Sequence, residues 1–288
     1  MRLFLLPISR RRTLIYCQRQ FRVTTDRLSL LDKATGRAAK LWLQWESSNK
    51  SWQKRITQYG NQLLQRIPYE EWGLKSVPPL SARRKDEEMA DRASIPVTFP
   101  TNVIPSSQVG SILRTLAVER QALHRSRLWG SIVVMPVTAP VALVPIIPNL
   151  PFFYLVYRAW SHWRALSGSK HLEFLLDKNL LQSSPSLALD TIYATKNVPL
   201  LAATSTAHED TARADDDDPT SKAEKDTILL QPSDAKLIAD RLSVPELVVE
   251  LERAVHQVQA ALSQDTDAAS QTTQPSRTTT DAKDGPKR

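Results

Sequence analysis

The feature that most constrains this chain is an apolar run from Leu128 to Tyr157, which contains no charged residue. A helix rises about 1.5 Å per residue, so roughly 20 apolar residues cross a bilayer core, and this run is longer than that. Length therefore permits insertion into a membrane. Five prolines interrupt the run, and each removes a backbone donor and strains any helix that passes through it. A straight single span is not expected.

The prolines instead favour two apolar arms that meet at a tight bend, because the sequence Pro-Asn-Leu-Pro at residues 148–151 has the composition of a turn. We predict a proline-kinked membrane hairpin. The residues that define it are Pro136, Pro140, Pro145, Pro148, Asn149 and Pro151. The second arm is short, so a buried hydrophobic hairpin in a soluble protein is the alternative.

Both ends of the apolar run carry cations. The predicted cationic membrane flanks are Arg125, Arg127, Arg158 and Arg164. Positively charged flanks tend to stay on one side of a membrane, so two cationic ends favour an even number of passes. Beyond the run, residues 152–178 read as one helix with a weak point at Gly168.

Composition excludes several classes of site. The chain has 7 glycines against 19 prolines, and neither a G-x-G-x-x-G nor a Walker pattern occurs. Cys17 is the only cysteine, so an internal disulfide, a zinc cluster of thiolates and a C-x-x-C pair are impossible. His162 and His171 are nine residues apart, which is too far for a paired metal site on one helix. We expect no enzyme activity and no cofactor.

The formal charge of +8 is unevenly placed. No acidic residue precedes Asp26, whereas six arginines do, which is one mark of mitochondrial import. Four consecutive aspartates, residues 215–218, lie towards the other end. No nucleic-acid-binding motif accompanies the basic head, so nucleic acid is not an expected partner. A basic head suits an anionic membrane surface better.

The organisation along the chain is mainly α-helical. Residues 1–24 are basic and form either a targeting signal or a small retained β-hairpin, and their low serine content favours retention. Further on, we predict a basic amphipathic helical region (25–76), a Pro-rich linker (77–105), a helix with the membrane hairpin and a following helix (106–181), a disordered acidic linker (182–231), two short amphipathic helices (232–263) and a disordered tail (264–288). The fold class expected is thus a helical membrane-associated protein.

Glu70 and Glu71 lie in a compact turn after Pro68, which is expected to end the amphipathic helix. Adjacent carboxylates could handle protons or cations, but such a pair at a helix end usually lies in solvent. The amphipathic helix before them could lie on an anionic bilayer or pack on the protein's own core.

Four stretches resemble the fungal family of mitochondrial potassium/proton exchange-related proteins. They are MRLFLLPISRRRTLIYCQ at the start, RIPYEEWGLKSVP from Arg66, LRTLAVERQALHR from Leu113, and APVALVPIIPNLPFFYLVYRAWSHWRALSGSKHLEFLL from Ala139. The proline-rich apolar block with its YRAWSHWR continuation is the most specific of them. Together the stretches span roughly residues 1–176.

The resemblance implies a mitochondrial inner-membrane protein required for, or regulating, exchange of potassium for protons. The implied partners are inner-membrane lipids, other membrane proteins of the exchange system or further copies of the chain, with potassium and protons as the ions. The apolar run itself contains no titratable side chain, which favours an accessory subunit over the exchanger. A scaffolding protein of the inner membrane without transport activity is the alternative.

Overall fold

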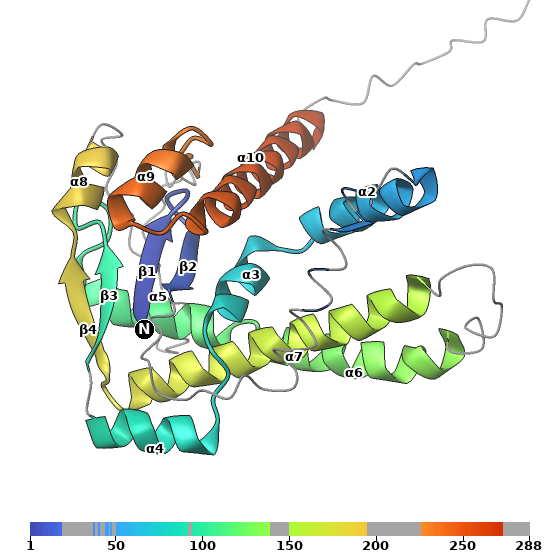
Figure 1. The fold of residues 1–288 in the computed structure, drawn as a ribbon. Coiled ribbons are helices and arrows are strands. Elements are labelled where there is room, and N and C mark those ends of the chain that lie inside the picture. The colour runs from blue at the N-terminus through green and yellow to red at the C-terminus, as the bar shows by residue number, and fades with distance from the viewer. Residues whose placement is uncertain are drawn as a thin grey trace, which may run out of the picture.

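The computed structural model describes residues 1–18, 50–91, 94–138, 150–194 and 226–272, together with five single residues between 37 and 47. Its centre is a four-stranded sheet with the strand order β2-β1-β3-β4 (Figure 1). The strands are β1 (Arg2–Pro7), β2 (Thr13–Gln18), β3 (Ile95–Phe99) and β4 (Leu181–Pro185). β1 and β2 form an antiparallel hairpin, whereas β1–β3 and β3–β4 are parallel pairs.

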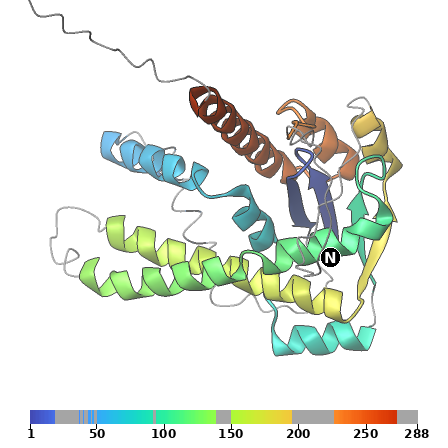
Figure 2. The same ribbon diagram turned by 180° about the vertical axis from the view of Figure 1, so that it is seen from behind.

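Helices cover both faces of the sheet. They are α2 (Ser51–Gln65), α3 (Tyr69–Ser76), α4 (Ala82–Asp91), α5 (Val109–Val118), α6 (Gln121–Thr138), α7 (Leu150–Asp177), α8 (Leu187–Ala194), α9 (Asp234–Leu242) and α10 (Leu247–Thr272), with a short 3-10 turn at Ser106–Gln108 before α5. Figure 1 shows α9 in front of the sheet, and Figure 2, from behind, shows α5 there.

Two hydrophobic cores follow from the alternation of side chains along β1. Phe4 and Leu6 point to one face and join buried residues of α8, α9 and α10. Leu3 and Leu5 point to the other face and join residues of α5 and α7. Because both faces of β1 are buried, its apolar residues are consecutive and do not alternate with polar residues.

α6 and α7 pack along each other as a helical hairpin, and α3 lies across α7 (Figures 1 and 2). Gly168 permits this close crossing, since a Cβ atom there would overlap the carbonyl oxygen of Leu74 in α3. Gly73 serves the opposite side of α3 in the same way, against the backbone of Ile15 in β2. The two glycines therefore hold α3 between the sheet and the hairpin.

The predicted fold class is wrong: the described residues form a mixed α/β structure built on a four-stranded sheet, not a mainly α-helical one. Of the helices in the described ranges, none has both the length and the apolar character that crossing a bilayer requires. Two helical arms do flank the proline-rich turn, but Pro140, Pro145, Pro148 and Asn149 lie outside the described residues. Pro136 lies inside α6 and Pro151 is the second residue of α7.

The strands that sequence reasoning missed lie where a linker was expected. β3 and α4 fall within residues 77–105, and β4 and α8 fall within or next to the start of residues 182–231. β3 contains Pro96 and β4 ends on Pro185, so neither has the local appearance of a central strand. β3 pairs in parallel with β1, and β4 pairs in parallel with β3. In each case the partner residues lie about 90 positions away, which no local pattern encodes.

Candidate functional site

Two neighbouring carboxylates in the first turn of α3 bind arginines of the hairpin region, one just before α6 and one in α7. Negative charge is favoured in this turn of α3 by the helix dipole. Arg120, which directly precedes α6, donates a 2.7 Å hydrogen bond to Glu70. Arg158 of α7 donates to both oxygens of Glu71, at 3.0 and 3.3 Å. The Glu70–Glu71 pair therefore links the sheet side of the molecule to both helices.

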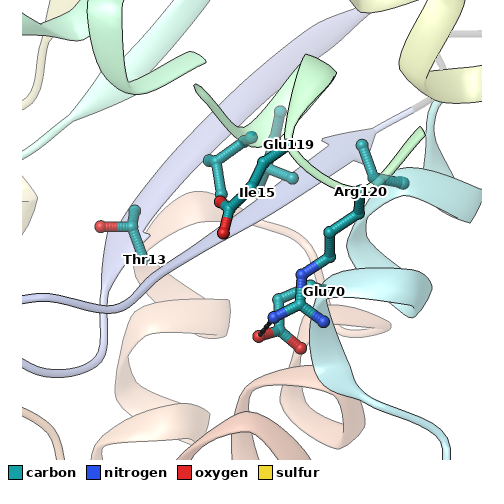
Figure 3. A pocket seen from close by; sticks show the side chains of 7 residues that line it. Thr13, Ile15, Glu70, Glu119 and Arg120 are labelled. Carbon is teal, nitrogen blue, oxygen red and sulfur yellow. Dashed lines mark hydrogen bonds and ion pairs between the residues drawn. The ribbon is translucent and has the colours of Figure 1, made fainter. Parts of the chain in front are cut away.

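The outer of these ion pairs lies in a shallow pocket between β2, α3 and the α5–α6 junction (Figure 3). Figure 3 shows Arg120 extended towards Glu70, with Ile15 of β2 and Glu119 beside them. The side chains of Arg120 and Glu70 keep 36% and 18% of their surface exposed. Because solvent screens such a pair, it contributes at most about 1 kcal/mol to stability.

The inner ion pair is different because Glu71 is buried, with only 1% of its surface exposed. Its Oε1 accepts a short hydrogen bond from the Ser161 hydroxyl in addition to the bonds from Arg158. Burial by itself would raise the pKa of Glu71, but the Ser161 hydrogen bond and the charge of Arg158 outweigh it, so the pKa is lowered. Glu71 therefore stays ionised although it is buried.

Arg158 also fixes the protonation of two buried histidines. Its Nη2 lies 2.9 Å from Nε2 of His162, and because arginine can only donate, this Nε2 accepts. The proton of the neutral His162 ring is then on Nδ1, which lies 3.1 Å from Nδ1 of His124 in α6. His124 Nδ1 must accept, so its proton is on Nε2. That atom is buried and has no hydrogen-bond partner among the described residues.

An additional proton on either ring would break this arrangement, since a second donor would face either Arg158 or the other imidazole. The pKa of His162 is accordingly lowered to about 4, chiefly by burial, with Arg158 and His124 acting in the same direction against Glu71. Burial also lowers the pKa of His124, and Arg120 and Arg127 add to that effect. The two rings are held neutral at neutral pH.

Lys75, one turn after Glu71 on α3, completes the cluster. Its Nζ donates to the Ser161 hydroxyl at 3.0 Å and lies 3.3 Å from the centre of the Trp72 ring. Arg253 of α10 also lies over Trp72, at 4.5 Å. Burial lowers the pKa of Lys75 to about 8, although Glu71 and Glu250 oppose the change. The Lys75 ammonium therefore titrates much closer to neutral pH than that of an ordinary lysine.

These contacts form one unbroken chain of hydrogen bonds, which we call the buried relay. It runs through Lys75, Ser161, Glu71, Arg158, His162 and His124. Three elements supply its members: α3 contributes Lys75 and Glu71, α7 contributes Ser161, Arg158 and His162, and α6 contributes His124. A change of charge at one end can therefore alter how the hairpin is attached to the sheet.

The relay also brings together three groups that could ligate a metal, since atoms of Glu71, His124 and His162 lie within 4.8 Å of one another. The electrostatics do not suit a metal ion. Arg158 occupies both Glu71 oxygens, and a metal on Nδ1 of His162 would require a proton on Nε2, where Arg158 already donates. With Lys75 nearby as a second cation, the cluster does not fit a divalent ion.

The four arginines of the predicted cationic flanks lie in two different environments. Arg125 and Arg127 are exposed on α6. Arg158 belongs to the relay, and Arg164 is buried with 7% of its surface exposed. A role for any of them at a membrane stays a prediction.

The expectation that Glu70 and Glu71 lie in solvent is wrong for Glu71. Sequence reasoning also missed the pairing of His124 with His162. A hairpin whose bend is centred near residue 144, the middle of the gap between α6 and α7, would place these positions roughly opposite each other. The predicted bend at residues 148–151 instead pairs position 124 with the far end of α7. The predicted bend therefore gave no reason to pair His124 with His162.

His171 is a further buried histidine, which lies apart from the relay near the C-terminal end of α7. Its Nδ1 lies 2.8 Å from the carbonyl oxygen of Pro78, and its Nε2 lies 2.8 Å from the Glu88 carboxylate on α4. Both neighbours are acceptors, so either ring nitrogen finds a partner when it carries a proton. This pair fixes α4 against α7 and reads as a structural contact.

Comparison with known proteins identifies the family. A family model described as mitochondrial K+-H+ exchange-related matches residues 2–176, and the chain belongs to this family. An uncharacterized protein of Schizosaccharomyces pombe is 29% identical over 190 residues, which are 66% of this chain and 81% of that protein. An uncharacterized protein of Saccharomyces cerevisiae is 29% identical over 164 residues, about half of each chain. No solved structure matches.

The matched region contains β1 to β3 and nearly all of α7, so every member of the buried relay lies within it. The resemblance to potassium/proton exchange-related proteins drawn from the sequence is confirmed. The family's description relates the chain to mitochondria and to potassium/proton exchange.

Proposed function

We propose that this chain is an accessory, regulatory component of mitochondrial potassium/proton exchange that acts at the inner membrane, with the buried relay as its proton-responsive part. The observation that carries the proposal is the continuous chain of buried, hydrogen-bonded ionisable groups from α3 to α6. Its occurrence inside the region that matches an exchange-related family supports the same reading.

The relay handles protons rather than potassium. A potassium ion needs several free oxygen ligands, but both Glu71 oxygens are taken by Arg158 and Ser161. The positive charges of Arg158 and Lys75 repel a further cation. A proton needs no such cage, because it is gained or lost by a side chain in place.

Regulation follows from what the charge state of the relay does to packing. Charged groups face it from four elements: Glu71 and Lys75 of α3, Arg127 and His124 of α6 with Arg120 just before it, Arg158 and His162 of α7, and Glu250 and Arg253 of α10. Loss of the Lys75 proton above about pH 8 leaves Glu71 with Arg158 as its main cationic partner. Because Lys75 of α3 and Arg158 of α7 repel each other, loss of the Lys75 charge tightens the attachment of the hairpin to α3, and a partner protein can respond to that change.

Two measurements test the proposed role. Mitochondria from cells that lack the chain should exchange potassium for protons more slowly than normal mitochondria, as followed with a proton-sensitive dye under an imposed potassium gradient. The purified chain in lipid vesicles should give no such flux by itself. Potassium-dependent proton flux from the purified chain would make it the exchanger. Normal exchange without the chain would favour a scaffold.

The role of the relay is tested separately with Lys75→Met, which removes the titrating ammonium and keeps the length of the side chain. We expect mitochondria with this variant to lose the change in exchange rate that wild type shows between about pH 7 and 9. Lys236→Met is the matched control, because Lys236 lies exposed on α9, and it should keep the wild-type pH profile. Identical profiles for wild type and both variants would remove Lys75 from the account.

A further inference from the structure

The halves of α6 and α7 that flank residues 139–149 project away from the sheet (Figures 1 and 2). They expose large apolar side chains. On α6, Trp129, Val133 and Val137 follow at four-residue steps and are 60%, 70% and 76% exposed. On α7, Phe153 is 61% exposed, and Val156 is exposed one turn later. Single exposed apolar residues are ordinary, but a group of this size on two paired helices marks an interaction surface.

We call the exposed apolar residues Trp129, Val133, Val137, Phe153 and Val156 the hairpin-end surface. The charged residues around it are all cationic. The sequence contains no acidic residue between Glu119 and Glu173, a stretch that includes all of α6 and most of α7. Arg125 and Arg127 are exposed on α6 within about one turn of Trp129. A partner that covers the apolar side chains therefore meets a cationic rim, which selects a negatively charged partner.

We infer that the hairpin-end surface docks on an anionic lipid bilayer, where it inserts into the headgroup boundary. The ten residues from Trp129 to Thr138 rise about 15 Å along the helix, which suits an element that enters a bilayer by about 5–10 Å at an angle. Tryptophan prefers the level of the headgroups, and arginines beside it attract anionic lipid. The inference rests on the proposed location at the inner membrane, and its test requires no exchange measurement.

Flotation of the purified full chain with vesicles tests this surface directly. We expect the chain to float with phosphatidylcholine vesicles that contain about a third anionic phospholipid, and to float far less with phosphatidylcholine alone. Val133→Glu/Val137→Glu should abolish flotation, whereas Val249→Glu, at an exposed valine of α10, should leave it unchanged. Arg125→Gln/Arg127→Gln should weaken binding to the anionic vesicles by about 30-fold, because each cation near such a surface contributes about 1 kcal/mol.

Three results would overturn the inference. Equal flotation of wild type and Val133→Glu/Val137→Glu would place the lipid contact elsewhere on the chain. Equal binding to neutral and anionic vesicles would remove the role of the arginine rim. Self-association of wild type in sedimentation, lost in Val133→Glu/Val137→Glu and accompanied by no vesicle binding, would assign the surface to a second copy of the chain. Circular dichroism of each variant verifies that the helices are retained.

Discussion

Replacing Arg158 with methionine isolates the energetic role of the buried relay. The substitution removes three hydrogen bonds, two to Glu71 and one to His162, and leaves the Glu71 carboxylate with Ser161 as its remaining direct donor. The Glu71 side chain is 2% exposed and that of Arg158 is 12% exposed, so water cannot replace the lost partner. Breaking a buried pair on one side costs about 3–5 kcal/mol.

That loss is a large part of the roughly 5–15 kcal/mol by which a folded domain is stable. At about 2–4 °C per kcal/mol for a chain of this size, the midpoint of thermal unfolding should fall by roughly 6–20 °C. Urea unfolding followed by far-ultraviolet circular dichroism measures the free energy itself. The m-value should stay unchanged, because the surface that unfolding exposes is nearly the same.

A double-mutant cycle separates the ion pair from other effects of the substitution. Glu71→Leu/Arg158→Met removes both charges, so no uncompensated ion remains, and we expect it to regain most of the stability that Arg158→Met loses. The coupling energy should exceed about 2 kcal/mol. A loss below about 1 kcal/mol for Arg158→Met, or additive effects of the two substitutions, would refute the reasoning.

Three further predictions concern the same region. The pKa of His162 is about 4 against an ordinary value of 6.5, so between these pH values the unfolded chain binds more protons than the folded chain. Stability should therefore decline as the pH falls from 6.5 to 4, and it should decline less in His162→Gln. Urea titrations at each pH measure this difference. Because the pKa of Lys75 is about 8 rather than 10.5, its contribution to the free energy of unfolding should rise by about 3 kcal/mol as the pH increases between these values. The difference in unfolding free energy between wild type and Lys75→Met should change by the same amount. A difference that does not depend on pH would contradict the burial of the Lys75 charge. Gly168→Ala should destabilise by about 1–3 kcal/mol because its Cβ meets the backbone of α3, whereas Gly130→Ala, with open space around it on α6, should be neutral or stabilising by up to about 1 kcal/mol; equal effects in thermal melts would argue against the tight crossing.

The helical arms of the chain could be predicted from the sequence because their signals are local. Residues 152–178 were expected to form one helix, and α7 runs from Leu150 to Asp177. The apolar runs on either side of the turn at residues 8–12 indicated the β1–β2 hairpin as one of two alternatives. The two helices expected between residues 232 and 263 correspond to α9 and α10, although α10 continues to Thr272.

The sheet could not be predicted because its pairing is not local. β3 reads IPVTF and β4 reads LQSSP. β3 lies inside the sheet only because it pairs with β1 and β4, and β4 is a strand only because it pairs with β3. Because no central sheet was predicted, the amphipathic helices and the apolar run had no protein surface to cover. A membrane was therefore the favoured place for hydrophobic burial. The sheet supplies that place instead, for Leu172 and Leu175 of α7 and for Leu113 of α5.

The buried relay escaped prediction for a related reason. Its members are separated by up to 91 positions, from Glu71 to His162, and their meeting depends on how α3 crosses the hairpin. Adjacent carboxylates and isolated histidines have an ordinary solvent or core explanation when they are read singly. Only the crossing that Gly168 permits brings them into one hydrogen-bonded group.

The central claim is that the buried relay makes potassium/proton exchange responsive to protons, and one measurement tests it most directly. Mitochondria that lack the chain are supplied with either wild type or Glu71→Leu/Arg158→Met, and potassium-driven proton flux is recorded across a pH series. The double variant is expected to fold, so equal protein levels and thermal stability serve as the internal control. We predict that wild type restores both the rate and its dependence on pH, while the folded double variant does not restore the dependence. Full recovery of the wild-type pH profile by the double variant would contradict the account.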